Sequence, residues 1–195
     1  MYTVTHVLTA LIICLLLRGR LPQRSLLLFA LGSFLPDIDH LYMHRFLLHS
    51  IFFLLSSLAV SRLLLKSFAL TLGVLLHFLE DMLASNFNTL LYPITLIDLG
   101  LGLWWLYSTW FNLAVTLLFA SLLILREGMI LKHRTLQDVI RFTLMMLASI
   151  SFGSAKASEI LLGYVDPILV EGARFTSVTI LLTAYFKPYR RDENT

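Results

Sequence analysis

Long apolar runs separated by short polar breaks extend along the whole chain, and they constrain its fold more than any other feature. The runs lie at residues 3–17, 24–36, 47–65, 67–83, 99–125, 135–153 and 166–186. Only 14% of the residues are charged, whereas a soluble domain carries about 25%, so lipid is the solvent that suits this composition. We therefore predict an all-α, polytopic helical bundle of about seven spans in the cell membrane. Several early runs are shorter than the roughly 20 residues that a span needs. Helices formed by these runs must either tilt and thin the bilayer, or end in a depression of the membrane surface that is lined by protein.

Basic residues mark one side of the predicted bundle, because they gather after alternate runs. Those after the first, third, fifth and seventh runs are Arg18, Arg20, Arg24, Arg62, Lys66, Arg126, Lys132, Arg134, Lys187, Arg190 and Arg191. Cytoplasmic loops are enriched in Lys and Arg, so we predict a cytoplasmic C-terminus and an N-terminus outside. This orientation brings His6, the segment 35–50 and the pair His77 and Asp81 to one outer face. It leaves His133 on the inner side.

Several classes of protein are excluded by the sequence. Residues 1–17 are not predicted to be a cleaved signal, because no Lys or Arg opens the apolar run and Arg18 follows it. The single cysteine, Cys14, rules out an internal disulfide. A net charge of only +3 gives no indication of a nucleic-acid partner. The HExxH, GxSxG and P-loop motifs are absent.

The segment 35–50 concentrates polar side chains in an otherwise apolar chain. They are Asp37, Asp39, His40, His44, Arg45 and His49. Pro36 disfavours a helical conformation for Leu35, so we predict an extended break, in which Asp37 and Asp39 point opposite ways and cannot easily hold one ion. Alternatively, one aspartate, Asp39 before Asp37, is a helix cap or turn residue.

The second polar group is the pair His77 and Asp81, which lie four residues apart in the run LLHFLEDML. This spacing puts both side chains on one face of a helix, where an imidazole and a carboxylate can hold a divalent metal. The alternative is a hydrogen bond on the helix surface near the membrane interface. Glu80 points roughly 100° away and is expected to be solvated or to support a ligand from outside.

Each of these polar groups has a structural explanation when taken alone, but their gathering at one membrane face points to function. Ionisable groups near membrane depth are costly and mark functional sites. Histidine and aspartate together suit zinc better than iron or manganese. We expect one membrane domain over residues 1–195, with the metal site in 1–95 and a helical scaffold in 96–195. The segment 154–165 is left open between a loop and a surface helix.

At these polar residues the sequence resembles the YdjM-type family of membrane-bound, predicted metal-dependent hydrolases. The matching pieces, in order, are THVLTA with His6, LPDIDH at 35–40, HRFLLHS at 44–50, HFLEDM at 77–82 and LYP at 91–93. The resemblance covers about residues 1–95. Phe46, Leu47 and Leu48 stand where the family usually has Gly, a variable residue and Thr. The Thr-Pro that often follows the HxxxDM piece is replaced by Ala84 and Ser85. These changes affect local turn geometry and leave the His and Asp residues in place.

More remotely, the pattern is similar to that of zinc-dependent phospholipases C. Those enzymes gather an N-terminal group, several His and Asp, and an HxxxD helix around clustered zinc ions. The similarity implies phosphoester chemistry, and the membrane setting implies a lipid or a lipid-linked phosphate that arrives by lateral diffusion.

We therefore predict a membrane-embedded hydrolase that uses one to three zinc ions to activate water at the outer membrane face. The predicted metal-binding residues are His6, Asp37, Asp39, His40, His49, His77 and Asp81. Of these, Asp39 and His40, together with His44, are either further ligands or groups that support the ligands. Arg45 is expected to steady developing negative charge, with Asp39 or His44 as general acid or base.

Two other functions remain open from the sequence. A non-catalytic metal-binding protein, such as a transporter or sensor, would use the same residues, although transporter sites are expected near the bilayer midplane. In a purely structural reading, the polar residues lock short helices together, and Arg45 is an interface anchor.

Overall fold

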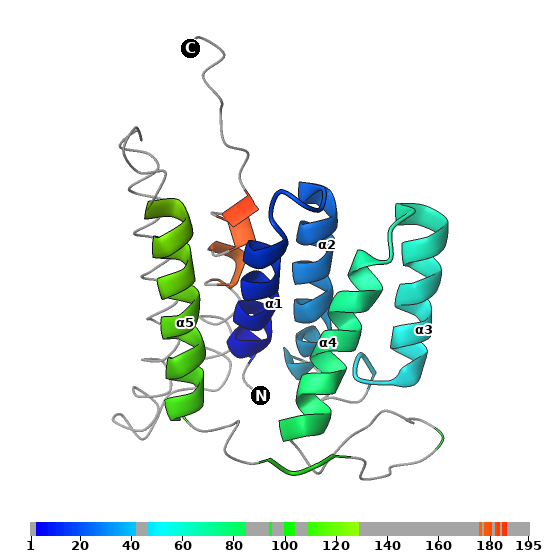
Figure 1. Cartoon of the computed structure of the whole chain (residues 1–195). Coiled ribbons are helices and arrows are strands. Elements are labelled where there is room, and N and C mark those ends of the chain that lie inside the picture. Colours follow the sequence, from blue (N-terminus) through cyan, green and yellow to red (C-terminus); the bar gives the residue numbers. More distant parts are fainter. Residues whose placement is uncertain are drawn as a thin grey trace.

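Every named element in the described part of the chain is a helix, as a computed structural model shows (Figure 1). The structure describes residues 3–41, 47–84, 94, 100–103, 109–128, 176, 178–180, 182, 183, 185 and 186. The elements are α1 (Thr3–Leu17), α2 (Gln23–Phe34), the 3-10 helix η1 (Leu35–Leu41), α3 (Ile51–Val60), the π-helix η2 (Ser61–Leu65), α4 (Ala69–Ala84) and α5 (Thr109–Gly128). The predicted all-α class is confirmed for these residues. The predicted run 135–153 and the segment 154–165 lie outside them.

The membrane-crossing part of the prediction has a different outcome. Within the described ranges, no helix combines enough length with enough apolar character to cross a membrane. The seven spans therefore stay a prediction.

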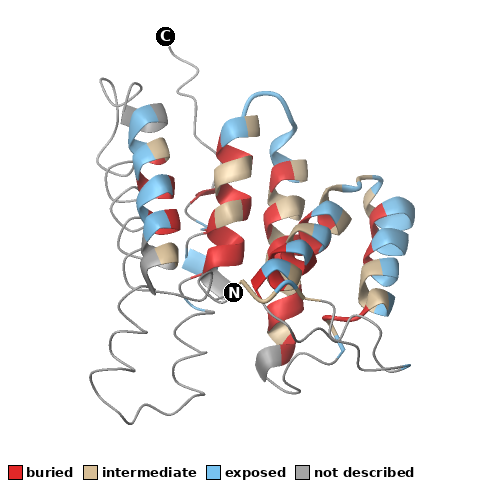
Figure 2. Cartoon of the chain, turned by 60° about the horizontal axis from the view of Figure 1, so that its bottom comes forward, coloured by how far each residue is buried: buried red, intermediate tan, exposed pale blue. Residues whose placement is uncertain are grey.

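Helix α1 forms the centre of the described structure, and its buried face is the main apolar core. Figure 2 shows buried residues along α1, with α5 on one side and α2 on the other. The core residues of α1 are Val7, Leu8, Leu11, Cys14 and Leu15. They pack with Leu26 and Ala30 of α2, with Val115, Phe119 and Leu123 of α5, and with Val178, Leu182, Tyr185 and Phe186. His6 directly precedes the first of these core residues and lies in the first turn of α1.

Helices α2 and α4 pack closely because glycines face each other where they cross. A Cβ atom added at Gly32 would collide with the carbonyl oxygen of Leu70, and one added at Gly73 would collide with that of Phe29. Small residues allow such close backbone approach between helices. The contact brings Ser33, next to Gly32, within reach of His77, one turn after Gly73.

Helix α3 and the following η2 bury small polar residues and expose large apolar ones. Their buried residues are Ser57 and Ser61, and the Thr71 hydroxyl donates a hydrogen bond of 2.8 Å to the Ser61 hydroxyl. The exposed side chains include Leu55, Leu63 and Leu64, and Figure 2 shows most of α3 as exposed. Water would oppose this pattern, whereas lipid favours it.

The predicted extended break at Leu35 and Pro36 is wrong. Leu35 has helical angles, φ −56° and ψ −41°, and its N–H donates to the carbonyl of Leu31, so η1 continues directly from α2. The restriction before proline is a bias that a hydrogen-bonded helical end outweighs here. A 3-10 helix has about three residues per turn, so Asp37 and Asp39 still point in different directions.

Candidate metal centre

Three histidines from three parts of the chain meet in one buried cluster. His6 belongs to the first turn of α1, His49 precedes α3, and His77 lies in α4. All three are buried. The ring centroids of His6 and His77 are 4.0 Å apart, and the Nε2 atoms of His49 and His77 are 3.1 Å apart. The fold thus gathers imidazoles that are more than 70 positions apart in sequence.

Each of these histidines has a hydrogen-bond acceptor at its Nδ1 atom. His6 Nδ1 lies 2.6 Å from Glu80 Oε2, His49 Nδ1 lies 3.2 Å from Asp39 Oδ2, and His77 Nδ1 lies 2.9 Å from the Ser33 carbonyl oxygen. A carbonyl oxygen and a carboxylate only accept, so each Nδ1 donates its proton. Once Nε2 has lost its proton, as metal binding requires, each ring would present a lone pair there.

Two buried carboxylates line the space to which these Nε2 atoms point. Asp81 Oδ1 is 3.3 Å from His6 Nε2, and its Oδ2 is 3.4 Å from His49 Nε2 and 3.6 Å from His77 Nε2. Asp37 Oδ1 is 3.7 Å from Nε2 of both His49 and His77. Two aspartates and three imidazole nitrogens therefore converge on one volume.

Local sequence explains how the turn before α3 delivers His49. Ser50 is the N-cap of α3 and accepts from the Phe53 N–H at 3.4 Å, and its hydroxyl donates to the Leu47 carbonyl at 2.7 Å. The Leu48 N–H donates to Asp39 Oδ2 at 3.0 Å. Asp39 thereby connects η1 to the turn. The same carboxylate oxygen also contacts His49 Nδ1 and so orients that ring.

The beginning of α1 is fixed by a separate contact. The Ser33 hydroxyl donates to the His6 carbonyl at 2.8 Å, while the Ser33 carbonyl accepts from His77. One residue of α2 thus holds two of the three histidines, from α1 and from α4.

The donor atoms fit a metal ion. A tetrahedral zinc with bonds of about 2.0–2.2 Å holds its ligand atoms roughly 3.3–3.6 Å apart. The atoms His49 Nε2, His77 Nε2 and Asp81 Oδ2 are separated by 3.1, 3.4 and 3.6 Å. A second set, His6, Asp37 and His77, also has one donor atom each within 4.8 Å of one another. Both sets share the single available nitrogen of His77, so they form one connected centre.

The electrostatics of the centre also favour a cation. The Nε2 atoms of His49 and His77 lie 3.1 Å apart, next to the carboxylates of Asp37 and Asp81. Neutral imidazole together with carboxylate is a donor set typical of zinc and related divalent metals. Acceptors that hold the outer nitrogen of a metal-binding histidine are the usual support of such sites, and all three histidines here have one.

Comparison with protein families gives a match over most of the chain. The family model described as YdjM inner membrane protein matches residues 1–160. The chain belongs to this family. The match extends well beyond residues 1–95, where the resemblance was expected to end, and it establishes a cell-membrane location. No curated protein and no solved structure matches the chain, so the similarity to phospholipases C is not shown.

Within this YdjM family member, the structure brings together five of the residues predicted as ligands. They are His6, Asp37, His49, His77 and Asp81. Asp39 lies at the outer nitrogen of His49, in the supporting role that the sequence left open for it. His40 belongs to η1, and its side chain lies outside the described residues, as do His44 and Arg45.

Two residues that hold the outer nitrogens of the histidines were not identified as such from the sequence. The role of Glu80 was left open, and Ser33 was missed. Glu80 was expected to be solvated or supporting, and it is buried and accepts from His6. Ser33 was not considered, because a backbone carbonyl carries no signal of its type. Its position beside a glycine in a predicted helix is the one hint of close packing that the sequence offers.

Proposed function

We propose that the chain is a membrane-embedded, metal-dependent hydrolase that cleaves a phosphoester in a lipid or lipid-linked substrate. The observation that carries this proposal is the convergence of three Nε2 atoms, each with its Nδ1 engaged elsewhere, on Asp37 and Asp81. Such a set is arranged to hold a divalent cation, and zinc fits the donor types best.

The protein groups have separate roles in this proposal. His49, His77 and Asp81 would hold the ion, with His6 and Asp37 completing the centre or holding a second ion. Asp39, Glu80 and the Ser33 carbonyl keep the rings in the orientation that ligation needs. These contacts would fix the centre before substrate arrives, so little reorganisation is needed at the moment of reaction.

The bound ion would lower the pKa of a water molecule towards about 7 and polarise the phosphoryl oxygen. Hydrolysis adds that water across the P–O ester bond and releases an alcohol and a phosphate. From the sequence, Arg45 would stabilise the negative charge that develops on phosphorus oxygens, and His44 would transfer the proton, because the Asp39 carboxylate is engaged by His49 and the Leu48 N–H.

A lipid substrate is supported by the family and by the surface of the helices. The family is one of inner membrane proteins, and α3 with η2 turns leucines outward while burying Ser57 and Ser61. We propose the polytopic arrangement of about seven spans, with the metal centre towards the outer face. The centre lies near the first turn of α1 and the last turns of α4, so it is close to an end of the bundle. That position suits an interfacial enzyme better than a transporter with a midplane site.

The test combines metal analysis with hydrolysis by purified full-length protein. We expect stoichiometric zinc in the wild type and in His133→Ala, and no stoichiometric zinc in the double variant His77→Ala/Asp81→Ala. We also expect the zinc-loaded wild type to release phosphate or a headgroup from members of a lipid panel. Zinc without any release would support the carrier or sensor function instead. Equal zinc in wild type and double variant would reject the metal centre.

A further inference from the structure

A short segment from the second half of the chain, residues 100–103, is hydrogen-bonded to the last turn of α4. The Leu101 N–H donates to the Met82 carbonyl at 2.7 Å, and the Leu103 N–H donates to the Leu83 carbonyl at 2.9 Å. Figure 1 shows the segment near the lower end of α4. The last four carbonyls of a helix have no partner inside that helix, and α4 ends one residue later. Two of these four carbonyls thus receive their hydrogen bonds from a later part of the chain.

Gly102 gives the segment the shape that these two bonds need. Its φ is +64°, in the left-handed region that glycine adopts readily, asparagine sometimes and most other residues rarely. Gly102 stands between the two donating residues, so its conformation sets how both N–H groups face the end of α4. Leu103 also packs, with Phe111 of α5, against the buried Ala84. A left-handed residue and a small apolar contact therefore hold the segment in place.

The turn of α4 that this segment holds carries two carboxylates of the candidate metal centre. Asp81 directly precedes Met82, and its oxygens lie 3.3 to 3.6 Å from the Nε2 atoms of the three clustered histidines. Glu80 Oε2 lies 2.6 Å from His6 Nδ1. Helix ends fray most easily, because their backbone groups have the fewest partners. Fraying of this turn would move both carboxylates away from the histidines.

We propose that the segment 100–103 is a positioning element of the metal centre. The N–H groups of Leu101 and Leu103 hold the last turn of α4 so that Asp81 and Glu80 meet the histidines. This inference rests on the proposed function, because it concerns the same centre. It gives the second half of the chain, expected from the sequence to be a helical scaffold, a part in forming the site.

The experiment compares two variants of Leu101, whose side chain is 69% exposed. Leu101→Pro removes the N–H that donates to Met82, whereas Leu101→Ala shortens the side chain and keeps the N–H. The preceding residue, Gly100, has no Cβ that a proline ring would meet. Zinc affinity is measured on purified full-length protein by competition with a chelator. The visible spectrum of the cobalt-substituted protein reports the geometry around the ion.

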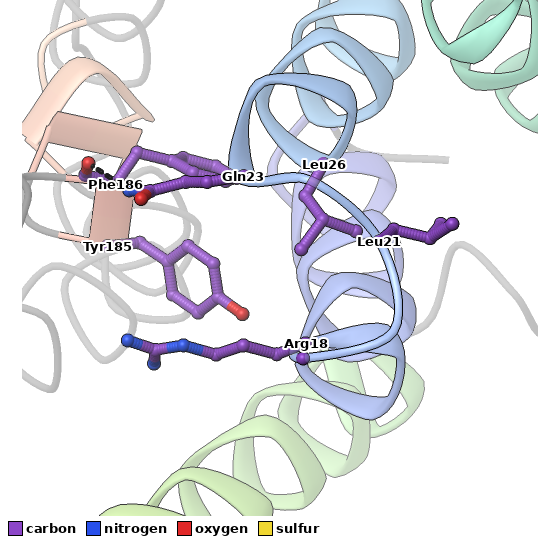
Figure 3. Close-up of a pocket in the computed structure, with 7 residues that line it drawn as sticks. Arg18, Leu21, Gln23, Leu26, Tyr185 and Phe186 are labelled. Atoms are coloured by element: carbon purple, nitrogen blue, oxygen red, sulfur yellow. Dashed lines mark hydrogen bonds between the residues drawn. The ribbon is translucent and has the colours of Figure 1, made fainter.

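A second hydrogen bond between distant parts of the chain supplies the control for general loosening of the fold. Gln23 Nε2 donates to the Phe186 carbonyl at 2.6 Å, and Figure 3 shows this bond as a dashed line. Gln23 begins α2, and Ser33, which accepts from His77, lies ten residues later, or roughly 15 Å along the helix. Gln23→Ala therefore removes a long-range hydrogen bond and leaves the last turn of α4 unchanged.

The expected result is a loss of zinc affinity in Leu101→Pro of about 10–100-fold, as is usual when a group that supports a ligand is removed. The cobalt bands of this variant should also shift. Leu101→Ala and Gln23→Ala should each change zinc affinity less than about twofold. Equal losses in Leu101→Pro and Leu101→Ala, or a loss as large in Gln23→Ala, would overturn the proposal.

Gly102 provides a second pair of variants in case Leu101→Pro does not fold. Gly102→Ala should lower zinc affinity, and Gly102→Asn should keep more of it, because asparagine adopts a positive φ more readily than alanine. An alanine variant that binds zinc as well as the asparagine variant would overturn the proposal. Wild-type affinity in Leu101→Pro would reject the positioning role alone. A wild type without stoichiometric zinc would reject the metal centre and this inference together.

Discussion

Glu80 and Asp81 are neighbours in sequence and carry the same charge, yet they contact different nitrogens of His6. Glu80 accepts at Nδ1 at 2.6 Å, and Asp81 lies 3.3 Å from Nε2. The first carboxylate orients the ring, and the second shares the space to which the lone pair points. A difference of one helical position, about 100°, thus separates a group that orients the ring from a candidate ligand.

This contrast gives a prediction for two matched variants in α4. Asp81→Asn should abolish stoichiometric zinc binding, because it removes a ligand charge that faces His49 and His77. Glu80→Gln should lower zinc affinity by only about 10–100-fold, the usual effect of losing a group that supports a ligand. Competition with a chelator of known affinity measures both. Equal losses in the two variants would contradict the assignment.

At the scale of elements, the site depends on how closely α2 and α4 approach. Gly32 and Gly73 leave no room for a Cβ between the two backbones, and this approach puts the Ser33 carbonyl 2.9 Å from His77 Nδ1. The capped turn before α3 then adds His49 from the other side. The positions of the candidate ligands are therefore consequences of backbone packing and not of side-chain choice alone.

We predict that Gly73→Ala destabilises the protein, although alanine favours a helix more than glycine does. The added methyl would meet the Phe29 carbonyl, and overpacking of this kind costs about 1–3 kcal/mol. Thermal unfolding in detergent measures the change, and zinc affinity should fall with it. Leu72→Ala, at a position that is 53% exposed, is the control and should change the unfolding temperature little. A stabilised Gly73→Ala variant would contradict the predicted clash.

At the scale of the whole molecule, the candidate metal centre draws its side chains from four separate segments. His6 comes from the central helix α1, Asp37 from η1, His49 from the turn before α3, and His77 and Asp81 from α4. Burying two carboxylates among three imidazoles is costly unless a cation or a proton on a ring balances their charge. An ion in this place would connect four segments.

We therefore predict that zinc raises the thermal stability of the protein and that a chelator lowers it. Binding to the folded state alone contributes about 4 kcal/mol when free metal exceeds its dissociation constant a thousandfold. Unfolding curves in detergent, with EDTA and with added zinc, measure the difference. The variant Asp81→Ala should show the same curve under both conditions. A wild type that is insensitive to EDTA would contradict this prediction.

Much of the helical pattern was predictable because the bounds of an apolar run indicate where a helix begins and ends. The run 3–17 coincides with α1 (Thr3–Leu17), and the run 67–83 differs from α4 (Ala69–Ala84) by two residues at one end and one at the other. The Leu35–Pro36 step was not predictable in this way. A local preference for extended backbone there is weaker than the hydrogen bond that continues α2.

The candidate ligands were predictable for a different reason. Charged and imidazole groups are rare in an apolar chain, so those that do occur stand out as His6, Asp37, His49, His77 and Asp81. Their separate roles were not predictable. Asp39 and Glu80 are as polar as the ligands, and only their positions at the outer nitrogens of His49 and His6 distinguish them.

The sequence by itself determined the helical class, the membrane family and the set of residues available to hold a metal. The class follows from the apolar runs, the family from ordered motifs that match its model over residues 1–160, and the available residues from their type. Only the tertiary structure decided which nitrogen of each histidine points inward and which carboxylate meets it. That choice depends on the glycine contact between α2 and α4 and on backbone acceptors such as Ser33, and distances between segments far apart in the chain are not encoded at any single position.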